Sequence, residues 1–203
     1  MHRLIGYLLA LCCISSLAYG ETLENIQHAL AKQSLVTGHF EQTRNIPALS
    51  RPLKSSGQFY IVKNRALLWD QQQPFAQQSL LTESAIYQGQ NGQLSQRDTG
   101  SAQMSQYFSQ LLVDIFSGDF TGLSEQFDIE QTATTTANWQ LNLSPQQAPL
   151  KQIFSQISLR GKQGVVEHIR LVEQRGDQTD IVLRMATPAL PLPTFLKQVL
   201  VSD

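Results

Sequence analysis

Few side chains in this 203-residue sequence have the types and the spacing that catalysis or metal binding requires. Beyond the first twenty residues the histidines are His28, His39 and His168, and none has another His or a Cys at a metal-ligand spacing such as His-x-x-x-His. The sequence contains no Gly-x-Ser-x-Gly elbow, no P-loop and no dinucleotide-binding fingerprint. Asp177 and Asp180 flank a predicted tight turn rather than a cleft. We therefore expect no metal and no cofactor, and an enzyme ranks last among the function classes.

The N-terminal segment has the three parts of a secretory signal peptide. Arg3 supplies a positive charge, residues 4–14 form a short apolar run, and Ala18-Tyr19-Gly20 places small residues at positions −3 and −1 of a cleavage site. The apolar run is shorter than the roughly 20 residues that a membrane-spanning helix needs. We predict that residues 1–20 are removed and that the mature chain of residues 21–203 is one periplasmic domain. An uncleaved membrane anchor is the alternative.

Cysteine content and charge narrow the function classes further. Cys12 and Cys13 both lie in the predicted signal peptide, so the mature chain would have no thiol and no disulfide. Without Arg3, 14 basic residues stand against 16 acidic residues, which gives a net charge of −2. This balance argues against nucleic-acid binding, which requires a basic surface. We expect a monomer.

Residues 22–97 predict one helix followed by strands. Leu23, Ile26 and Leu30 share one helical face after Thr22, which is placed as the N-cap, so we expect a helix over residues 22–33. The apolar period then changes to two, which predicts strands around residues 36–42, 57–61, 67–69 and 75–82. Strands over 85–88 and 94–97 flank Asn91-Gly92, a strong hairpin signal.

The second half predicts one helix with an apolar stripe and then five more strands. The helix covers residues 105–117 and ends at Gly118, and we call it the lid helix from here on. Strands are predicted over 127–134, 139–143, 154–160, 165–175 and 179–186, with turns between them. Residues 188–203 contain three prolines and a short closing helix. These elements predict an α+β fold with a strongly curved antiparallel sheet. The lid helix is the expected cover of its apolar face, and the N-terminal helix is the expected second cover.

Four spaced segments of the chain form one ordered pattern: Phe40-Glu41-Gln42-Thr43-Arg44, Ser56-Gly57-Gln58-Phe59, Leu67-Leu68-Trp69-Asp70 and Pro74-Phe75. In this pattern the chain resembles the LolA family of outer-membrane lipoprotein carriers. The resemblance implies an incomplete, open β-barrel whose concave face is capped by helices. It further implies a carrier of lipoproteins from an inner-membrane release complex to an outer-membrane receptor. It also implies that an arginine directly before the Trp holds the lid shut. Here that position is Leu68, and the nearest basic residue is Arg65.

The apolar residues fit a carrier on physical grounds as well. An acyl chain gains about 0.8 kcal/mol per buried CH₂, so release requires an apolar competitor such as a closing helix. We expect the concave face to line a hydrophobic ligand-binding cavity that is covered by a lid, although the same residues could form an ordinary filled core. A lipoprotein-sensing or lipid-sensing protein that does not shuttle cargo is the alternative function. The expected concave residues are Phe40, Phe59, Ile61, Leu67, Trp69, Leu81, Trp139, Leu141, Leu159, Ile169 and Leu183. The expected lid residues are Phe108, Leu111, Leu112, Ile115 and Phe116.

Overall fold

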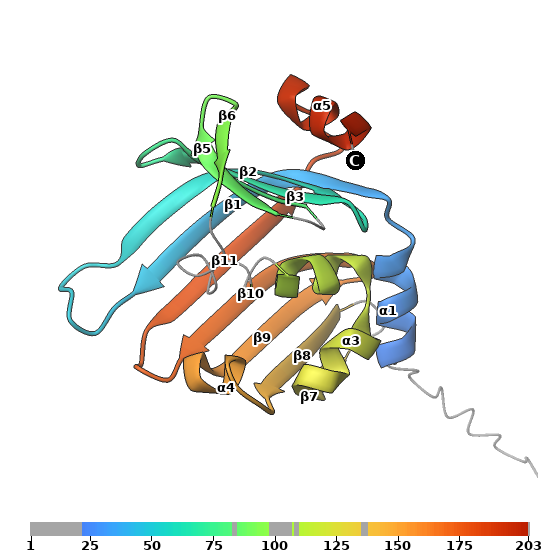
Figure 1. Cartoon of the computed structure of the whole chain (residues 1–203). Helices are drawn as coiled ribbons and strands as arrows, with labels where there is room; N and C mark the ends of the chain where they lie inside the picture. The colour runs from blue at the N-terminus through green and yellow to red at the C-terminus, as the bar shows by residue number, and fades with distance from the viewer. Residues whose placement is uncertain (1–21, 83–84, 98–106, 108–109, 135–137, 203) are drawn as a thin grey trace, which may run out of the picture.

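One antiparallel sheet of eleven strands curls around its own concave face in the computed structural model (Figure 1). The structure describes residues 22–82, 85–97, 107, 110–134 and 138–202. The strand order is β6-β5-β4-β3-β2-β1-β11-β10-β9-β8-β7, so two meanders meet where β1 pairs with β11. The sheet ends at β6 and β7 and does not close, which confirms the predicted open barrel.

The strand boundaries agree closely with the predicted segments. The first six strands are β1 (Leu35–Asn45), β2 (Leu53–Val62), β3 (Ala66–Gln73), β4 (Gln77–Thr82), β5 (Ile86–Gln90) and β6 (Gln93–Gln96). The other five are β7 (Phe127–Thr134), β8 (Asn138–Pro145), β9 (Phe154–Lys162), β10 (Val165–Glu173) and β11 (Gln178–Met185).

Local sequence signals explain where the first helix and the tight turns form. Helix α1 (Leu23–Ala31) begins after Thr22, whose side-chain oxygen accepts a hydrogen bond from the Asn25 backbone N–H at 3.3 Å, as expected for an N-cap. In the β5–β6 hairpin, Asn91 and Gly92 both have positive φ, as the tight turn predicted from this dipeptide requires.

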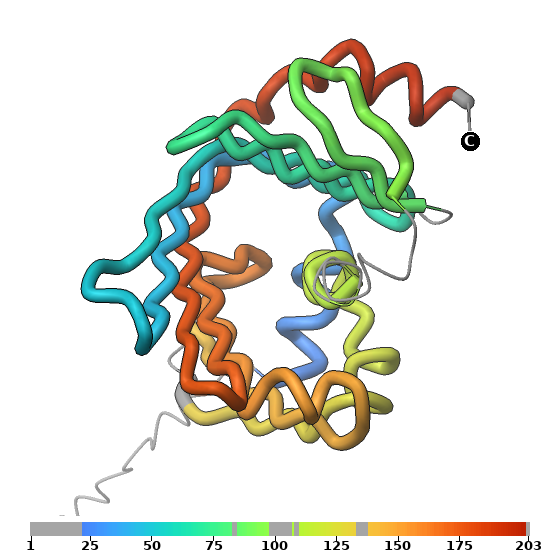
Figure 2. The backbone as a smooth tube through the Cα atoms, turned by 60° about the vertical axis from the view of Figure 1, so that its left-hand side comes forward, coloured from blue at the N-terminus to red at the C-terminus, as the bar shows by residue number. Residues whose placement is uncertain are grey.

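The chain between β6 and β7 contains the lid helix. The structure describes it over residues 110–117, while residues 101–106 and 108–109, which include the expected lid residue Phe108, lie outside the described residues. Figure 2, a view along the barrel, shows this helix end-on within the ring of strands, on the side where the sheet is open. Helix α3 (Phe120–Gln126) and helix α4 (Leu150–Ile153) follow, and neither was predicted from the sequence.

The last helix, α5 (Thr194–Ser202), packs on the convex side of the sheet (Figures 1 and 2). There Tyr60, Ala66, Leu68 and Leu80 form a second apolar cluster with Leu196 of α5. This part of the sheet is therefore buried on both faces, because the concave residues form a separate cluster. In the part of the chain that the structure describes, no helix is both long and apolar enough to cross a bilayer.

Gly118, at the end of the lid helix, is a position where the backbone requires glycine. Its φ is +69°, and a Cβ there would lie 2.6 Å from the carbonyl oxygen of Gln27 in α1. Gly118→Ala should therefore lower the free energy of unfolding by about 1–3 kcal/mol, because the alanine would be strained in the left-handed region. Urea denaturation measures this change.

Gly122→Ala is the matched control, since Gly122 lies in α3 and the nearest atom to its added Cβ is 3.4 Å away. Alanine is a better helix former than glycine, so this variant should be neutral or slightly stabilised. Equal destabilisation by both substitutions would contradict the strain argument.

Candidate functional site

The expected concave-face residues lie together in one apolar cluster. Ten of them are buried, with exposed fractions between 0 and 7 %, and Trp69 is partly buried and packs against the same cluster. They come from strands on both sides of the β1–β11 junction, so the curl of the sheet brings together residues that are far apart in sequence. Side chains of alternate strand residues point to the same face, which is why the period-two pattern identified them.

An aromatic group lies on the concave face of β1, β2 and β3. The rings of Phe40 and Trp69 stack with centroids 3.9 Å apart, and Phe59 lies 6.2 Å from Trp69. Phe59 also approaches Phe116 of the lid helix at 6.1 Å, which extends the aromatic contact from the sheet to the helix. Trp139, on the opposite half of the barrel, donates its indole N–H to the Gln163 carbonyl at 2.7 Å.

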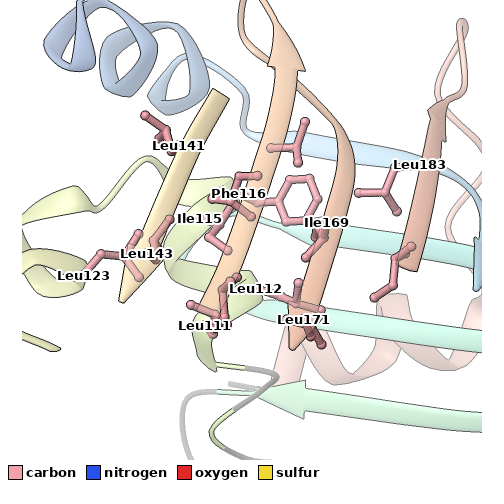
Figure 3. Packing of buried hydrophobic residues seen from close by; sticks show 14 of the residues in the cluster. Leu111, Leu112, Ile115, Phe116, Leu123, Leu141, Leu143, Ile169, Leu171 and Leu183 are labelled. Carbon is pink, nitrogen blue, oxygen red and sulfur yellow. The ribbon is translucent and has the colours of Figure 1, made fainter. Parts of the chain in front are cut away.

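The lid helix inserts its apolar stripe between the two halves of the barrel. Leu111, Leu112, Ile115 and Phe116 have exposed fractions of at most 3 %, and Figure 3 shows them among Leu141, Leu143, Ile169 and Leu171 of the sheet. Every expected lid residue that the structure describes thus contacts the concave cluster. Directional bonds do not explain this association, because the contacts in the cluster are apolar.

Close backbone approaches anchor the lid helix and the sheet to α1. Besides the approach of Gly118, a Cβ at Gly164 in the β9–β10 turn would lie 2.6 Å from the Ala29 carbonyl oxygen. The Lys63 ammonium donates to the Ala31 carbonyl at 2.6 Å, at the C-terminal end of α1, where a cation is favourable. The C-terminal end of the lid helix is therefore held at α1.

A pocket of about 250 Å³ with a mixed polar and apolar lining lies on the rim between the lid helix and the β2–β3 turn. Asn64 and Arg65 line it from the turn, and Gln110 and Asp114 line it from the helix. Burial, together with repulsion from Asp119, raises the pKa of Asp114, although Gln110 donates a hydrogen bond to its carboxylate at 2.7 Å. No local sequence pattern predicts this pocket, because it forms only where the β2–β3 turn meets the outward face of the lid helix.

The concave face becomes polar toward the β1–β2 and β10–β11 loops. Continuing past Phe40 on β1, Gln42 and Arg44 have the same inward orientation, and Arg44 donates to Glu173 and Asp177 at 2.9 Å each. We use the name polar mouth of the barrel for five residues, which are Gln42, Arg44, Ser55 of β2, Glu173 and Asp177. No sequence pattern pointed to the polar mouth, because Asp177 lies in the β10–β11 turn and the other residues are polar members of strands that were recognised by their apolar members.

Comparisons with known proteins identify the family. The model of the family described as outer membrane lipoprotein carrier protein LolA-like matches residues 18–190. The chain belongs to the LolA-like family.

Solved structures related to this LolA-like chain share little sequence with it. MucB has a TM-score of 0.50 and 14 % identity, and the match covers 87 % of this chain and 60 % of MucB. The LolA superfamily protein NE2245 from Nitrosomonas europaea has a TM-score of 0.45 and 11 % identity, with 84 % of this chain and 93 % of NE2245 covered. MucB in the MucA/MucB complex of Pseudomonas aeruginosa has a TM-score of 0.44 and 13 % identity, with 87 % and 58 % covered. A search of curated proteins found no match.

The structure corrects the expectation about the LolA-family latch at Leu68. Leu67 and Trp69 point to the concave face, so Leu68 between them points to the convex face, where it is fully buried in the cluster beneath α5. An arginine at this position would lie on the opposite face of the sheet from the lid helix. Arg65 does not contact the lid backbone in any described hydrogen bond and instead donates to the Leu200 carbonyl in α5.

A chain of charged contacts runs across the convex face of β9, β10 and β11. The Arg160 guanidinium lies 3.0 Å from Nδ1 of His168, and Nε2 of His168 lies 3.2 Å from Asp180, which also accepts from Arg170 at 2.7 Å. Because a guanidinium only donates, Nδ1 accepts and Nε2 carries the proton of a neutral imidazole. Burial lowers the pKa of His168, the two arginines lower it further, and Asp180 opposes them.

The convex position of Leu68 gives the first prediction from this region. Leu68→Arg should lower the free energy of unfolding by about 3–5 kcal/mol, because it buries an unpaired charge under α5. Leu68→Met, which conserves volume, should cost less than about 1.5 kcal/mol. Thermal and urea denaturation measure both changes, and a Leu68→Arg variant as stable as the parent would show that this side chain is not buried beneath α5.

The lowered pKa of His168 gives a pH-dependent prediction. The unfolded chain binds a proton at this site at a higher pH than the folded chain does, so the contribution of His168 to stability is complete above about pH 6.5 and is lost as the pH falls through the folded pKa. We expect His168→Gln to lose less stability than the parent between pH 7 and pH 5. Urea titrations at several pH values test this, and identical pH slopes would contradict it.

Proposed function

We propose that this LolA-like protein is a non-enzymatic periplasmic carrier that binds the acyl chains of lipoproteins, or of another lipid, on its concave face. The observation that supports the proposal is the apolar lid helix seated in the open side of the barrel. Within the described residues the lid helix is not part of the sheet, so residues 110–117 can leave the concave face without breaking a sheet hydrogen bond. The concave residues then become the binding surface for a chain that takes the place of the helix.

The lid helix and an acyl chain gain similar free energies from burial on the concave face. Burial of one large apolar side chain is worth about 1.5–3 kcal/mol, so the four described lid residues together are worth roughly 6–12 kcal/mol. A chain of about 15 methylenes gains roughly 12 kcal/mol on leaving water. Because the helix and the acyl chain compete for one surface, the net free energy of exchange is small, as reversible loading and delivery require.

The family description, outer membrane lipoprotein carrier protein LolA-like, supports lipoproteins as the cargo. The carrier would receive them from an inner-membrane release complex and give them to an outer-membrane receptor, as the resemblance to the LolA family implies. The predicted signal peptide, which lies outside the described residues, would place the protein in the periplasm. MucB, which shares this fold and has been crystallised with MucA, favours a second candidate, namely a protein-binding sensor of lipoproteins that does not shuttle cargo.

Site-specific photocrosslinking tests where acyl cargo binds. A photocrosslinking amino acid at Trp69 or at Leu112 should capture lipoprotein acyl chains, since one position lies on the concave sheet and the other on the lid stripe. Glu41 is the control, because it follows Phe40 on β1, points to the convex face and is 62 % exposed. Capture from Glu41 but from neither Trp69 nor Leu112 would refute the carrier site.

A further inference from the structure

The polar mouth of the barrel contains two buried polar atoms without a partner. Among the described residues, Nε of Arg44 and Oγ of Ser55 are the buried side-chain nitrogen and oxygen atoms that form no hydrogen bond. Buried polar atoms are normally paired, because an unpaired one loses its hydrogen bonds to water without replacement. Two such atoms at one place mark a position where a group from outside the chain, a water or a ligand, can supply the missing hydrogen bonds.

Strand register places both residues on the concave face and next to each other. Ser55 has the same orientation as Gly57 and Phe59 on β2, and Arg44 has the same orientation as Phe40 on β1. Ser55 pairs with Gln42 and Arg44 pairs with Leu53, so Ser55 and Arg44 are diagonal neighbours on one face. Side chains in this relation are close enough for both to contact one small group.

The mouth continues the apolar concave surface. Arg44 lies four residues beyond Phe40 on the same strand, which corresponds to about 14 Å at roughly 3.4 Å per residue. An acyl chain stacked along Phe40 and Trp69 would therefore bring its polar end to Arg44 and Ser55. The concave face is thus apolar around Phe40 and polar further along the strands, which matches a ligand with an apolar chain and a polar head.

The charges at the mouth restrict the kind of head group. Arg44 donates through one terminal nitrogen to both Glu173 and Asp177, so a single positive charge faces two negative ones. A head group with a net negative charge would be repelled, whereas Nε of Arg44 and the Ser55 hydroxyl still offer donors to acceptor oxygens. Ester carbonyls of a diacylglyceryl group and the phosphodiester of a zwitterionic phospholipid share this chemistry.

We propose that Arg44 and Ser55 form a subsite for the polar head of the bound lipid. The subsite donates hydrogen bonds to acceptor oxygens of the head group and disfavours a net negative charge. This inference rests on the proposed function, since it assigns the end of the ligand whose acyl chains occupy the concave face. The subsite sets which lipids the carrier accepts, while the apolar surface supplies affinity for any chain.

Ser55→Ala is the most direct test, because the Ser55 hydroxyl has no partner within the described chain and its removal should not destabilise the fold. Binding of dioctanoylglycerol, dioctanoyl phosphatidylethanolamine and dioctanoyl phosphatidylglycerol would be measured by tryptophan fluorescence, with hexadecane as a probe without a head group. We expect about fivefold weaker binding of at least one of the first two lipids, the size typical of one hydrogen bond, and unchanged hexadecane binding. The lipid that loses more affinity identifies the head-group source.

Ser56→Ala is the matched control, since Ser56 is the next residue on β2 and points to the convex face. It should bind all four probes as the parent does. Unchanged affinity of Ser55→Ala for both dioctanoylglycerol and the ethanolamine lipid would overturn the subsite, and equal parental affinity for the glycerol and ethanolamine phospholipids would overturn its charge preference. If the parent protein binds neither hexadecane nor any lipid, the carrier function itself fails.

Discussion

The open side of the barrel is the constraint on which the other features depend. A curled sheet with an apolar inner face exposes that face wherever its edges do not meet, and here the edges are β6 and β7. These two strands are consecutive in the chain, so the segment that connects them has to pass the opening. The lid helix lies in this segment, and its apolar stripe covers the surface that the sheet leaves open.

Burial on two faces explains the unusual composition of β2, β3 and β4. A strand covered on one face alternates between apolar and polar residues, but these strands contain consecutive buried pairs such as Leu67-Leu68 and Leu80-Leu81. The inner member of each pair faces the lid cluster and the outer member faces α5. Changes at neighbouring positions therefore act on different layers, and only the inner layer contributes to the proposed binding surface.

The sequence predicted the strands and the lid helix better than it predicted the tertiary contacts around them. Period-two alternation located the strands and the inward residues, and Asn91-Gly92 located a hairpin, because these signals are local. Alternation says which side chains share a face, but it does not say which layer covers the other face, so the role of Leu68 beneath α5 was mispredicted. The polar mouth was missed because pairing of Arg44 with Glu173 depends on tertiary contacts between residues far apart in sequence.

The pairing of β1 with β11 joins the first strand of the chain to the last one described. Contacts between segments so far apart form slowly, because a long loop has to close before they contribute stability. Because a chain is synthesised from its N-terminus, one edge of β1 stays unpaired until residues 178–185 of β11 have been made. During that interval the apolar face and the open edge of the first meander are exposed to association with other chains, so rapid completion of the sheet matters for the yield of folded protein.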